Sequence, residues 1–146
     1  MTSSKPVEAF FYGLYMDPDI LGPLGVVALN PRLAEAQGYR LDLRGGKAKI
    51  IPEAGASTWG LTFELSPSDL KSLYRTEATQ GYAPFELFVT GPDGTQRPVS
   101  CYNLPLDPQA PADSVYLAKL LPVARKLGLP AEYLSFLDNL SNPTSP

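Results

Sequence analysis

A glutamate on an otherwise apolar helical face is the residue of this sequence with the clearest potential for chemistry. The segment SPSDLKSLYRTEA, residues 66–78, predicts a helix in which Leu70, Leu73, Tyr74 and Glu77 share one face. Burial of the Glu77 carboxyl and the negative end of the helix dipole would both raise its pKa. A carboxyl group tuned in this way can serve as general base and then as general acid.

Other interpretations of Glu77 give it no catalytic role. Its side chain can point to water from a frayed helix end, or it can pair with Arg75 or Arg40. A partner site elsewhere in the chain is therefore needed to support catalysis.

The stretch FFYGLYM is the second candidate for a functional site. An apolar strand expected over 7–13 ends on Gly13, and the bulky residues Tyr12, Leu14 and Tyr15 surround this glycine. Glycine permits a positive φ and lets a ligand approach the main chain closely. Successive N–H groups in such a loop can form a small anion-binding nest. The alternative is an apolar corner whose tyrosines belong to the core.

Histidine is absent from the 146 residues, and this excludes several classes of enzyme. Ser-His-Asp and Cys-His catalysis both need an imidazole to take the proton of the nucleophile. Zinc sites built on histidine are excluded as well, and the single cysteine, Cys101, cannot form a thiolate cluster. The sequence also contains no phosphate-binding glycine motif. We therefore expect no zinc site of these two kinds and no bound nucleotide, with Asp, Glu, Tyr, Lys or Cys101 as the available proton carriers.

Composition and charge limit the kinds of molecule that this protein is expected to bind. Hydrophobic residues make up 44% of the chain and charged residues 18%, which indicates a globular protein. The net charge is −3 and the basic residues are scattered, so we expect no nucleic-acid surface. The most apolar window, ILGPLGVVAL, is too short to span a bilayer, and the N-terminus has no signal-peptide pattern. With one cysteine no internal disulfide can form, and we expect a cytoplasmic protein that is not bound to a membrane.

The periodicity predicts one α+β domain over 1–146, with a mostly antiparallel, barrel-like sheet and a few helices packed on it. Ser66 is the expected N-cap of the first helix, Gly38 a possible bulge and Pro122 the expected kink or interruption of a later helix. The expected strands cover 7–13, 33–43, 48–52 and 58–65, with a hairpin within 85–104. After the hairpin we expect a proline-rich connector (105–113), two helices (114–128 and 130–140) and a tail (141–146).

Four segments, in this order, resemble the γ-glutamylcyclotransferase-like (AIG2-like) family. They are AFFYGLYM, STWGLTFELSPSDLKSLYRTEATQGY, GPDGTQRPVSCYNL and VYLAKLLPVARKLGLPAEYLSFL. The resemblance implies a small β-barrel flanked by helices, with a cavity at one side. It also implies transferase or lyase chemistry that needs no metal and no cofactor, in which the α-amine of a γ-glutamyl amine or amide attacks the γ-carbonyl. The products are 5-oxoproline and a free amine.

The resemblance also implies roles for particular residues. Glu77 would be the general acid and base, and the backbone of Tyr12, Gly13, Leu14 and Tyr15 would hold the carboxylate or carbonyl of the substrate. The side chains implied as pocket walls are Tyr82 and Tyr102, although each can equally belong to the core.

The chain departs from the family pattern at three positions. Leu14 stands where the family has Ser or Thr, Tyr74 where it has Asp, and Ala78 where it has Gly. These departures favour a larger or less polar amide over a small γ-glutamyl amino acid. Two alternatives keep the fold without the reaction: a non-catalytic small-molecule-binding protein, favoured by Leu14, and an adaptor that docks through 105–113.

Overall fold

The structure is a computed structural model that describes residues 6–44, 47–74, 82–91, 93–103 and 114–140. The predicted connector and tail lie outside these residues. In chain order the elements are β1 (Val7–Phe11), η1 (Leu14–Met16), α1 (Pro18–Leu21), η2 (Gly22–Leu24), β2 (Leu29–Arg44), β3 (Lys47–Leu65), α2 (Pro67–Leu73), β4 (Ala83–Thr90), β5 (Gln96–Asn103), α3 (Ser114–Lys126) and α4 (Ala131–Leu140).

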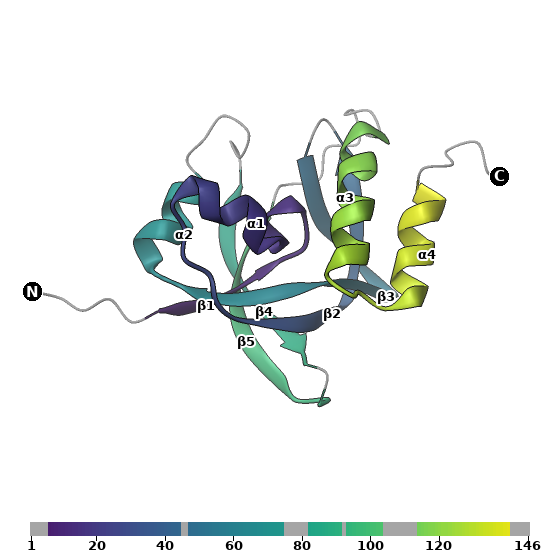
Figure 1. Ribbon diagram of the computed structural model, residues 1–146. Coiled ribbons are helices and arrows are strands. Elements are labelled where there is room, and N and C mark those ends of the chain that lie inside the picture. Colours follow the sequence, from purple (N-terminus) through teal and green to yellow (C-terminus); the bar gives the residue numbers. More distant parts are fainter. Residues whose placement is uncertain (1–5, 45–46, 75–81, 92, 104–113, 141–146) are drawn as a thin grey trace, which may run out of the picture.

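The strands form a closed barrel in the order β1-β3-β2-β4-β5 (Figure 1). The pairings β1–β3, β2–β3, β2–β4 and β4–β5 are antiparallel, and β1 runs parallel to β5 where the barrel closes. This confirms the predicted fold, a mostly antiparallel barrel flanked by helices. Helices α3 and α4 stand side by side next to one end of the long β2–β3 pair, and α1 and α2 lie toward the other side (Figure 1).

The third and fourth predicted strands are one strand, β3, so the prediction of two was wrong. The two halves of β3 pair with β2 in different registers. The register changes between the pair Tyr39–Pro52 and the pair Gln37–Ser57. The extra residues of β3 at this shift include Gly55, which has a φ of +84°. Their composition, EAGAS, is typical of a loop, which is why the sequence pattern breaks where the strand continues.

Gly38 lies opposite this irregularity, with a φ of +86°, and the bulge predicted there is confirmed. A left-handed conformation is accessible to glycine without steric cost, so the strand can change register at this residue.

The N-cap predicted for α2 is confirmed, because the backbone N–H of Asp69 donates to Ser66 Oγ at 3.1 Å. The interruption predicted at Pro122 is wrong: α3 runs through it from Ser114 to Lys126. Proline removes only the N–H that would bond to the carbonyl of Ala118, and both residues lie on the exposed side of the helix, where water can bind that carbonyl. Gly128, with a φ of +78°, follows the end of α3, as predicted.

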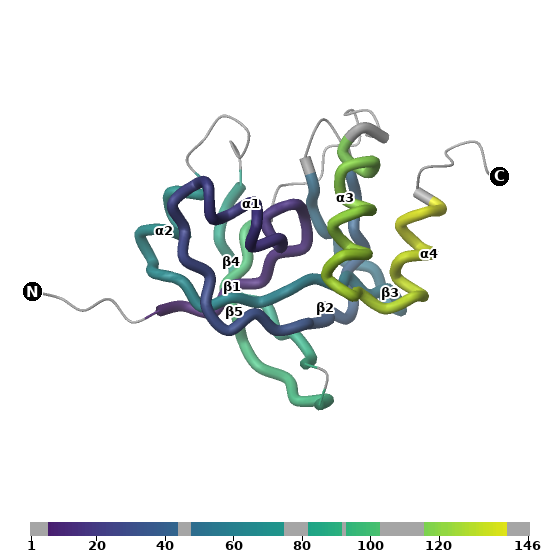
Figure 2. Tube along the Cα trace, viewed as in Figure 1, coloured from purple at the N-terminus to yellow at the C-terminus, as the bar shows by residue number. Residues whose placement is uncertain are grey.

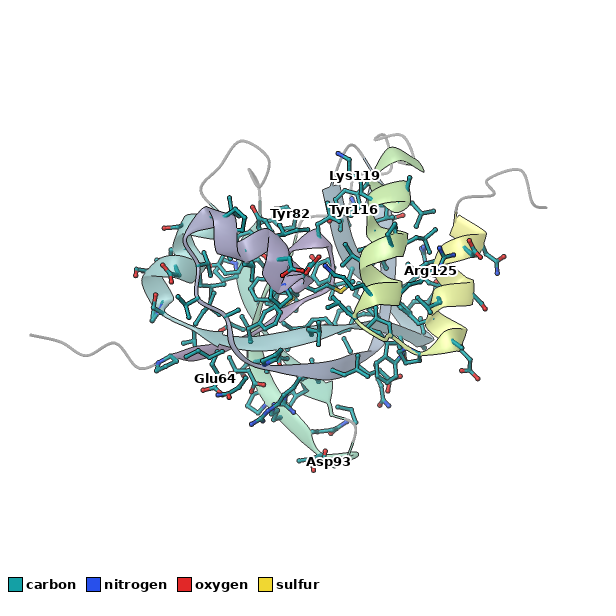
Figure 3. The ribbon with its side chains drawn as sticks, viewed as in Figure 1. Glu64, Tyr82, Asp93, Tyr116, Lys119 and Arg125 are labelled. Atoms are coloured by element: carbon teal, nitrogen blue, oxygen red, sulfur yellow. The ribbon has the colours of Figure 1, made fainter. Side chains whose placement is uncertain are left out.

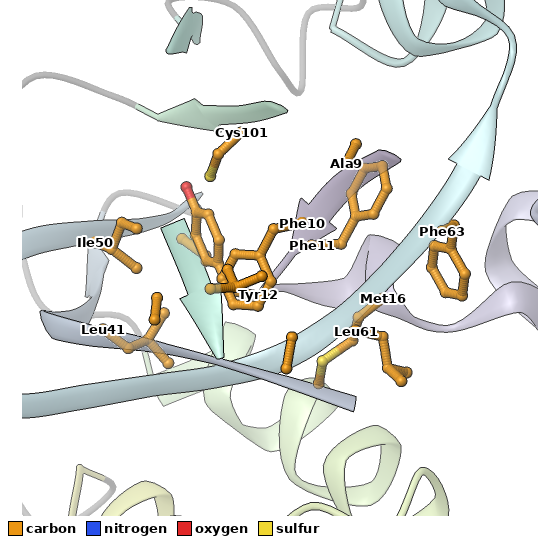
Figure 4. Close-up of a cluster of buried hydrophobic side chains, with 14 of the residues drawn as sticks. Ala9, Phe10, Phe11, Tyr12, Met16, Leu41, Ile50, Leu61, Phe63 and Cys101 are labelled. Atoms are coloured by element: carbon orange, nitrogen blue, oxygen red, sulfur yellow. The ribbon is translucent and has the colours of Figure 1, made fainter. Parts of the chain in front are cut away.

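The core fills the barrel and continues under the helices. In Figure 4 Phe11 of β1 lies beside Phe63 of β3, and the centroids of these two rings are 5.6 Å apart. Helices α3 and α4 contribute the fully buried Leu117, Leu120 and Leu137. Among the described residues, no helix is long and apolar enough to cross a membrane.

Candidate functional site

The chain turns sharply after β1, and Gly13 lies at this turn. In Figure 2 the segment that follows β1 curls back beside α3. Gly13 precedes η1 with φ −114° and ψ −151°, an extended conformation that any residue adopts. The positive φ that glycine permits is therefore not used at this position. The glycine is required for space instead, because a Cβ at this position would lie 2.4 Å from the Tyr116 hydroxyl oxygen and 3.3 Å from Ala48 Cβ.

Tyr116 is the main residue near this loop that the sequence reasoning missed. The backbone N–H of Leu14 donates to the Tyr116 hydroxyl at 3.0 Å. The two residues are 102 positions apart in the sequence, and α3 brings them together. The one signal in the sequence is the place of Tyr116 in the C-terminal segment VYLAKLL, which carries part of the family resemblance.

Tyr12 belongs to the barrel interior. It is 5% exposed, and its hydroxyl donates to the carbonyl of Tyr102 at 2.8 Å. Burial raises the pKa of Tyr12 well above its ordinary value. Figure 4 shows the Tyr12 hydroxyl directed toward Cys101 of β5. The structure therefore supports the alternative interpretation for Tyr12, namely that it is a tyrosine of the core.

Three tyrosines surround Tyr74, the residue at the C-terminal cap of α2. The rings of Tyr74 and Tyr102 stack, with centroids 4.1 Å apart and planes 4° from parallel. Tyr15 meets Tyr74 edge-on at 6.0 Å, and Tyr82 lies 5.4 Å from it. We call Tyr15, Tyr74, Tyr82 and Tyr102 the tyrosine cluster. The structure thus brings three of the predicted site residues together, around a residue at which the chain departs from the family pattern.

Two hydrogen bonds connect the tyrosine cluster to β3 and to α2. The Tyr82 hydroxyl donates to the carbonyl of Ala48 (Figure 3). The Cβ of Ala48 also lies 3.3 Å from the position that a Cβ on Gly13 would take. The Tyr15 hydroxyl donates to the carbonyl of Leu73 at 3.5 Å. Leu14 itself is half-buried and packs against the core.

The acid–base character of this region follows from its burial. Burial, with a smaller contribution from neighbouring tyrosines and Cys101, raises the pKa of Tyr74 and of Tyr82. Burial also raises the pKa of the Cys101 thiol. All three groups are therefore neutral near pH 7, and they can donate hydrogen bonds but are poor proton acceptors. A base at this place has to be a carboxylate or an amine.

Glu77 and Ala78 lie outside the described residues. The described chain stops at Tyr74 and resumes at Tyr82, and these two residues belong to the same aromatic cluster. The two described residues that flank the segment with Glu77 therefore both lie in the tyrosine cluster. Of the suggested ion-pair partners of Glu77, Arg40 is paired with Glu53, at 3.1 Å between Nε and Oε1. No group of three or more potential metal ligands occurs in the part of the chain that the structure describes.

Comparisons with known proteins agree with the sequence resemblance. Residues 57–137 match the AIG2-like family. A curated relative, gamma-glutamylcyclotransferase of Bos taurus, is 26% identical over 121 residues, which cover 74% of this chain. The matched part amounts to 64% of the length of that relative.

Solved structures share the fold. A structure of an uncharacterized protein from Homo sapiens has a TM-score of 0.75 at 24% identity, and a structure of a gamma-glutamyl cyclotransferase has a TM-score of 0.75 at 23% identity. In both comparisons the match covers 91% of this chain and 86% of the other. At this level of identity, the two structures carry information about the fold alone.

Proposed function

The chain belongs to the AIG2-like family, and from that premise we propose that it is an enzyme of the γ-glutamylcyclotransferase type. It acts on a γ-glutamyl amine or amide. The α-amine nitrogen of the substrate forms a bond to the γ-carbonyl carbon, and the bond between that carbon and the leaving nitrogen breaks. The products are 5-oxoproline and a free amine. The bovine relative bears the name of this activity, which supports the proposal.

Glu77 carries the proton in this scheme. It accepts a proton from the α-ammonium group, which makes the nitrogen a nucleophile, and later delivers a proton to the leaving nitrogen. The single observation that supports this assignment best is the position of Tyr74 and Tyr82. Their ring centroids are 5.4 Å apart, and they are the described residues nearest to Glu77 in the sequence on either side of it. The neighbouring phenols and the Cys101 thiol are neutral near pH 7, which leaves the base to a group such as Glu77.

The remaining requirement is to fold the substrate on itself. Nucleophile and electrophile belong to one molecule, so positioning supplies much of the rate enhancement. We assign the positioning of the substrate carboxylate or carbonyl to the backbone of the loop from Tyr12 to Tyr15. Tyr82 and Tyr102 would contact the amine half of the substrate. Their phenol rings and the apolar Leu14 favour an amine half that is larger or less polar than a small amino acid.

The direct test is to incubate the full-length protein with a panel of γ-glutamyl amines and γ-glutamyl peptides and to measure 5-oxoproline. The panel should pair polar with apolar amines of similar size. We expect product from at least one member, with higher kcat/KM for the apolar amine of a pair. A panel without any product contradicts the proposed reaction and favours a non-catalytic binding protein.

Glu77→Gln tests the proton carrier separately. This variant keeps the size of the side chain and removes its basicity, so we expect at least a hundredfold loss of kcat. Glu86→Gln is the matched control, since Glu86 is an exposed glutamate on β4, and we expect it to retain activity. Undiminished product from Glu77→Gln would contradict the role of Glu77 without contradicting the reaction.

A further inference from the structure

Tyr74 and Tyr102 form a flat aromatic stack between the end of α2 and strand β5. Their ring centroids are 4.1 Å apart and their planes are 4° from parallel. The main chain of Tyr74 is held by α2, because its backbone N–H donates to the carbonyl of Lys71 at 3.1 Å. The main chain of Tyr102 is held by β5, in which it pairs with Pro84 of β4. Two separate elements of the fold therefore align the rings.

The tyrosine cluster presents ring surface to its surroundings. All four of its residues are half-buried, so part of their surface stays accessible. Two of the hydroxyls are used inside the protein, since that of Tyr15 donates to the carbonyl of Leu73 and that of Tyr82 to the carbonyl of Ala48. For these two residues, the carbon surface of the ring is what remains to contact a ligand.

The tyrosine cluster is uncharged in the neutral range. Tyrosine phenols are protonated near pH 7, and burial raises the pKa of Tyr74 and of Tyr82 further. An aspartate at position 74, as in the family pattern, would be ionised at this pH. Aromatic rings carry partial negative charge on their faces, so the stack disfavours a ligand group that bears a carboxylate. An uncharged aromatic group can instead lie flat against it.

We propose that Tyr74 is the specificity-determining residue for the amine half of the substrate, and that the Tyr74–Tyr102 stack selects an uncharged aromatic amine. The inference rests on the proposed function, in which Tyr82 and Tyr102 contact that half. An aromatic ring on the stack gains the contact geometry that already joins its two members, whereas a saturated ring of similar size gains apolar contact alone. A cage for a cation leaves a space between its rings, but Tyr74 and Tyr102 lie in direct face-to-face contact.

Competition between two substrates in one reaction tests the selection. The amine halves of γ-glutamylbenzylamide and γ-glutamyl(cyclohexylmethyl)amide are similar in size, and only the first is aromatic. With the full-length protein we expect kcat/KM to be about fivefold higher for the benzylamide, which corresponds to an aromatic contact of ordinary strength. The ratio of the two released amines gives this preference, and it does not depend on the fraction of protein that is folded. Equal release of the two amines overturns the proposal.

Tyr74→Leu locates the preference at this residue. Leucine keeps an apolar side chain without the ring, so we expect the preference for the benzylamide to fall below about twofold. Phe88→Leu is the matched control, because Phe88 is 61% exposed on β4, and it should keep the full preference. A preference that survives Tyr74→Leu overturns the assignment to Tyr74. If Tyr74→Leu does not fold, Tyr102→Leu removes the other ring of the stack and decides in its place.

A cationic probe and a binding measurement complete the test. Cleavage of γ-glutamyl(4-aminobutyl)amide in preference to the benzylamide would indicate recognition of a cation by the rings and would overturn the choice of an uncharged amine. If the unchanged protein yields no 5-oxoproline from any of these amides, the proposed function fails, and calorimetric Kd values then decide the selection. A lower Kd for the benzylamide that Tyr74→Leu removes supports the stack, whereas equal values, or binding of neither amide, overturn it.

Discussion

The hydroxyl oxygen of Tyr116 lies where a methyl group on Gly13 would have to be, 2.4 Å from the ideal Cβ position. The next closest atom of that ring, Cζ, lies at an ordinary contact distance of 3.6 Å. The residue types at the two positions therefore depend on each other. A tyrosine at 116 requires a glycine at 13, whereas a phenylalanine would relax that requirement.

Gly13→Ala should be destabilising in a way that Tyr116→Phe partly reverses. We expect Gly13→Ala to lower the free energy of unfolding by about 2–3 kcal/mol, because the methyl group overlaps the hydroxyl. In the Tyr116→Phe background the same change should cost about 1–2 kcal/mol less. Urea denaturation of the single variants and the double variant gives the coupling. Strictly additive effects would mean that the hydroxyl moves aside freely.

Gly60→Ala should be among the most damaging single changes in the barrel. A Cβ on Gly60 of β3 would lie 2.1 Å from the carbonyl oxygen of Phe11 and 3.1 Å from Tyr12 Cα, and backbone atoms cannot rotate away. We expect a loss of about 3 kcal/mol or more, measured by thermal or urea unfolding. Gly22→Ala is the matched control. Gly22 has a helical φ of −53°, with nothing within 4 Å of its Cβ position apart from its chain neighbours. We therefore expect a cost below about 1 kcal/mol, caused by Pro23, which disfavours a helical conformation of a non-glycine residue before it.

The ionised Glu8 carboxyl should make the free energy of unfolding decrease at acidic pH. Hydrogen bonding from the Arg97 guanidinium, which lies 2.6 Å from Glu8 Oε2, lowers the pKa of this carboxyl below 4.5. Because the folded pKa is lower than the unfolded one, the contribution is fully present above about pH 4.5 and is lost as the pH falls through the folded pKa. Glu8→Gln should lower the free energy of unfolding by about 1–2 kcal/mol at pH 7 and much less at pH 3.

The exposed pair Arg40–Glu53 serves as control for the acid effect. Its side chains are 33% and 50% exposed, so Glu53→Gln should change stability by less than about 0.5 kcal/mol at either pH. An equal pH dependence of Glu8→Gln and the unchanged chain would contradict the assignment to Glu8.

Tyr74→Ala should destabilise the tyrosine cluster, whereas Tyr74→Phe should be tolerated. The ring of Tyr74 stacks on Tyr102 and also contacts Tyr15 and Tyr82. We expect a loss of about 3 kcal/mol for the alanine variant and less than about 1 kcal/mol for phenylalanine, which keeps the ring contacts. Chemical denaturation measures both. A phenylalanine variant as unstable as the alanine variant would place the contribution in the hydroxyl instead of the ring.

The sequence was sufficient to predict the barrel, because alternation and capping are local signals. Ser66 and Asp69 identify the start of α2, and Gly38 marks the register shift between β2 and β3. The same local signals failed at β3, where a loop-like composition lies inside one strand, and at Pro122, whose lost hydrogen bond faces water. Composition alone does not show where a strand or helix continues through residues that usually end it, because that depends on the contacts around those residues.

The candidate site was harder to predict, since its contacts join distant parts of the chain. Gly13 was singled out because glycine permits a positive φ and a close approach of a ligand to the main chain, whereas the structure shows a need for space beside Tyr116. Tyr74 was noted only as a departure from the family pattern, yet it is the centre of the tyrosine cluster. Neither relationship has a periodicity that could be read along the sequence, because each depends on how α2 and α3 are placed against the barrel.

The parallel pairing of β1 with β5 affects how copies of the chain can meet. Pairs Ala9–Ser100 and Phe10–Cys101 join these two strands, so β1 has β5 on one side and β3 on the other. Along these residues β1 presents no open row of backbone donors and acceptors to a strand from a second copy. Self-association by strand addition at this seam would first have to separate β1 from β5 and expose Phe10 to water, which makes the seam a barrier against aggregation as well as part of the fold.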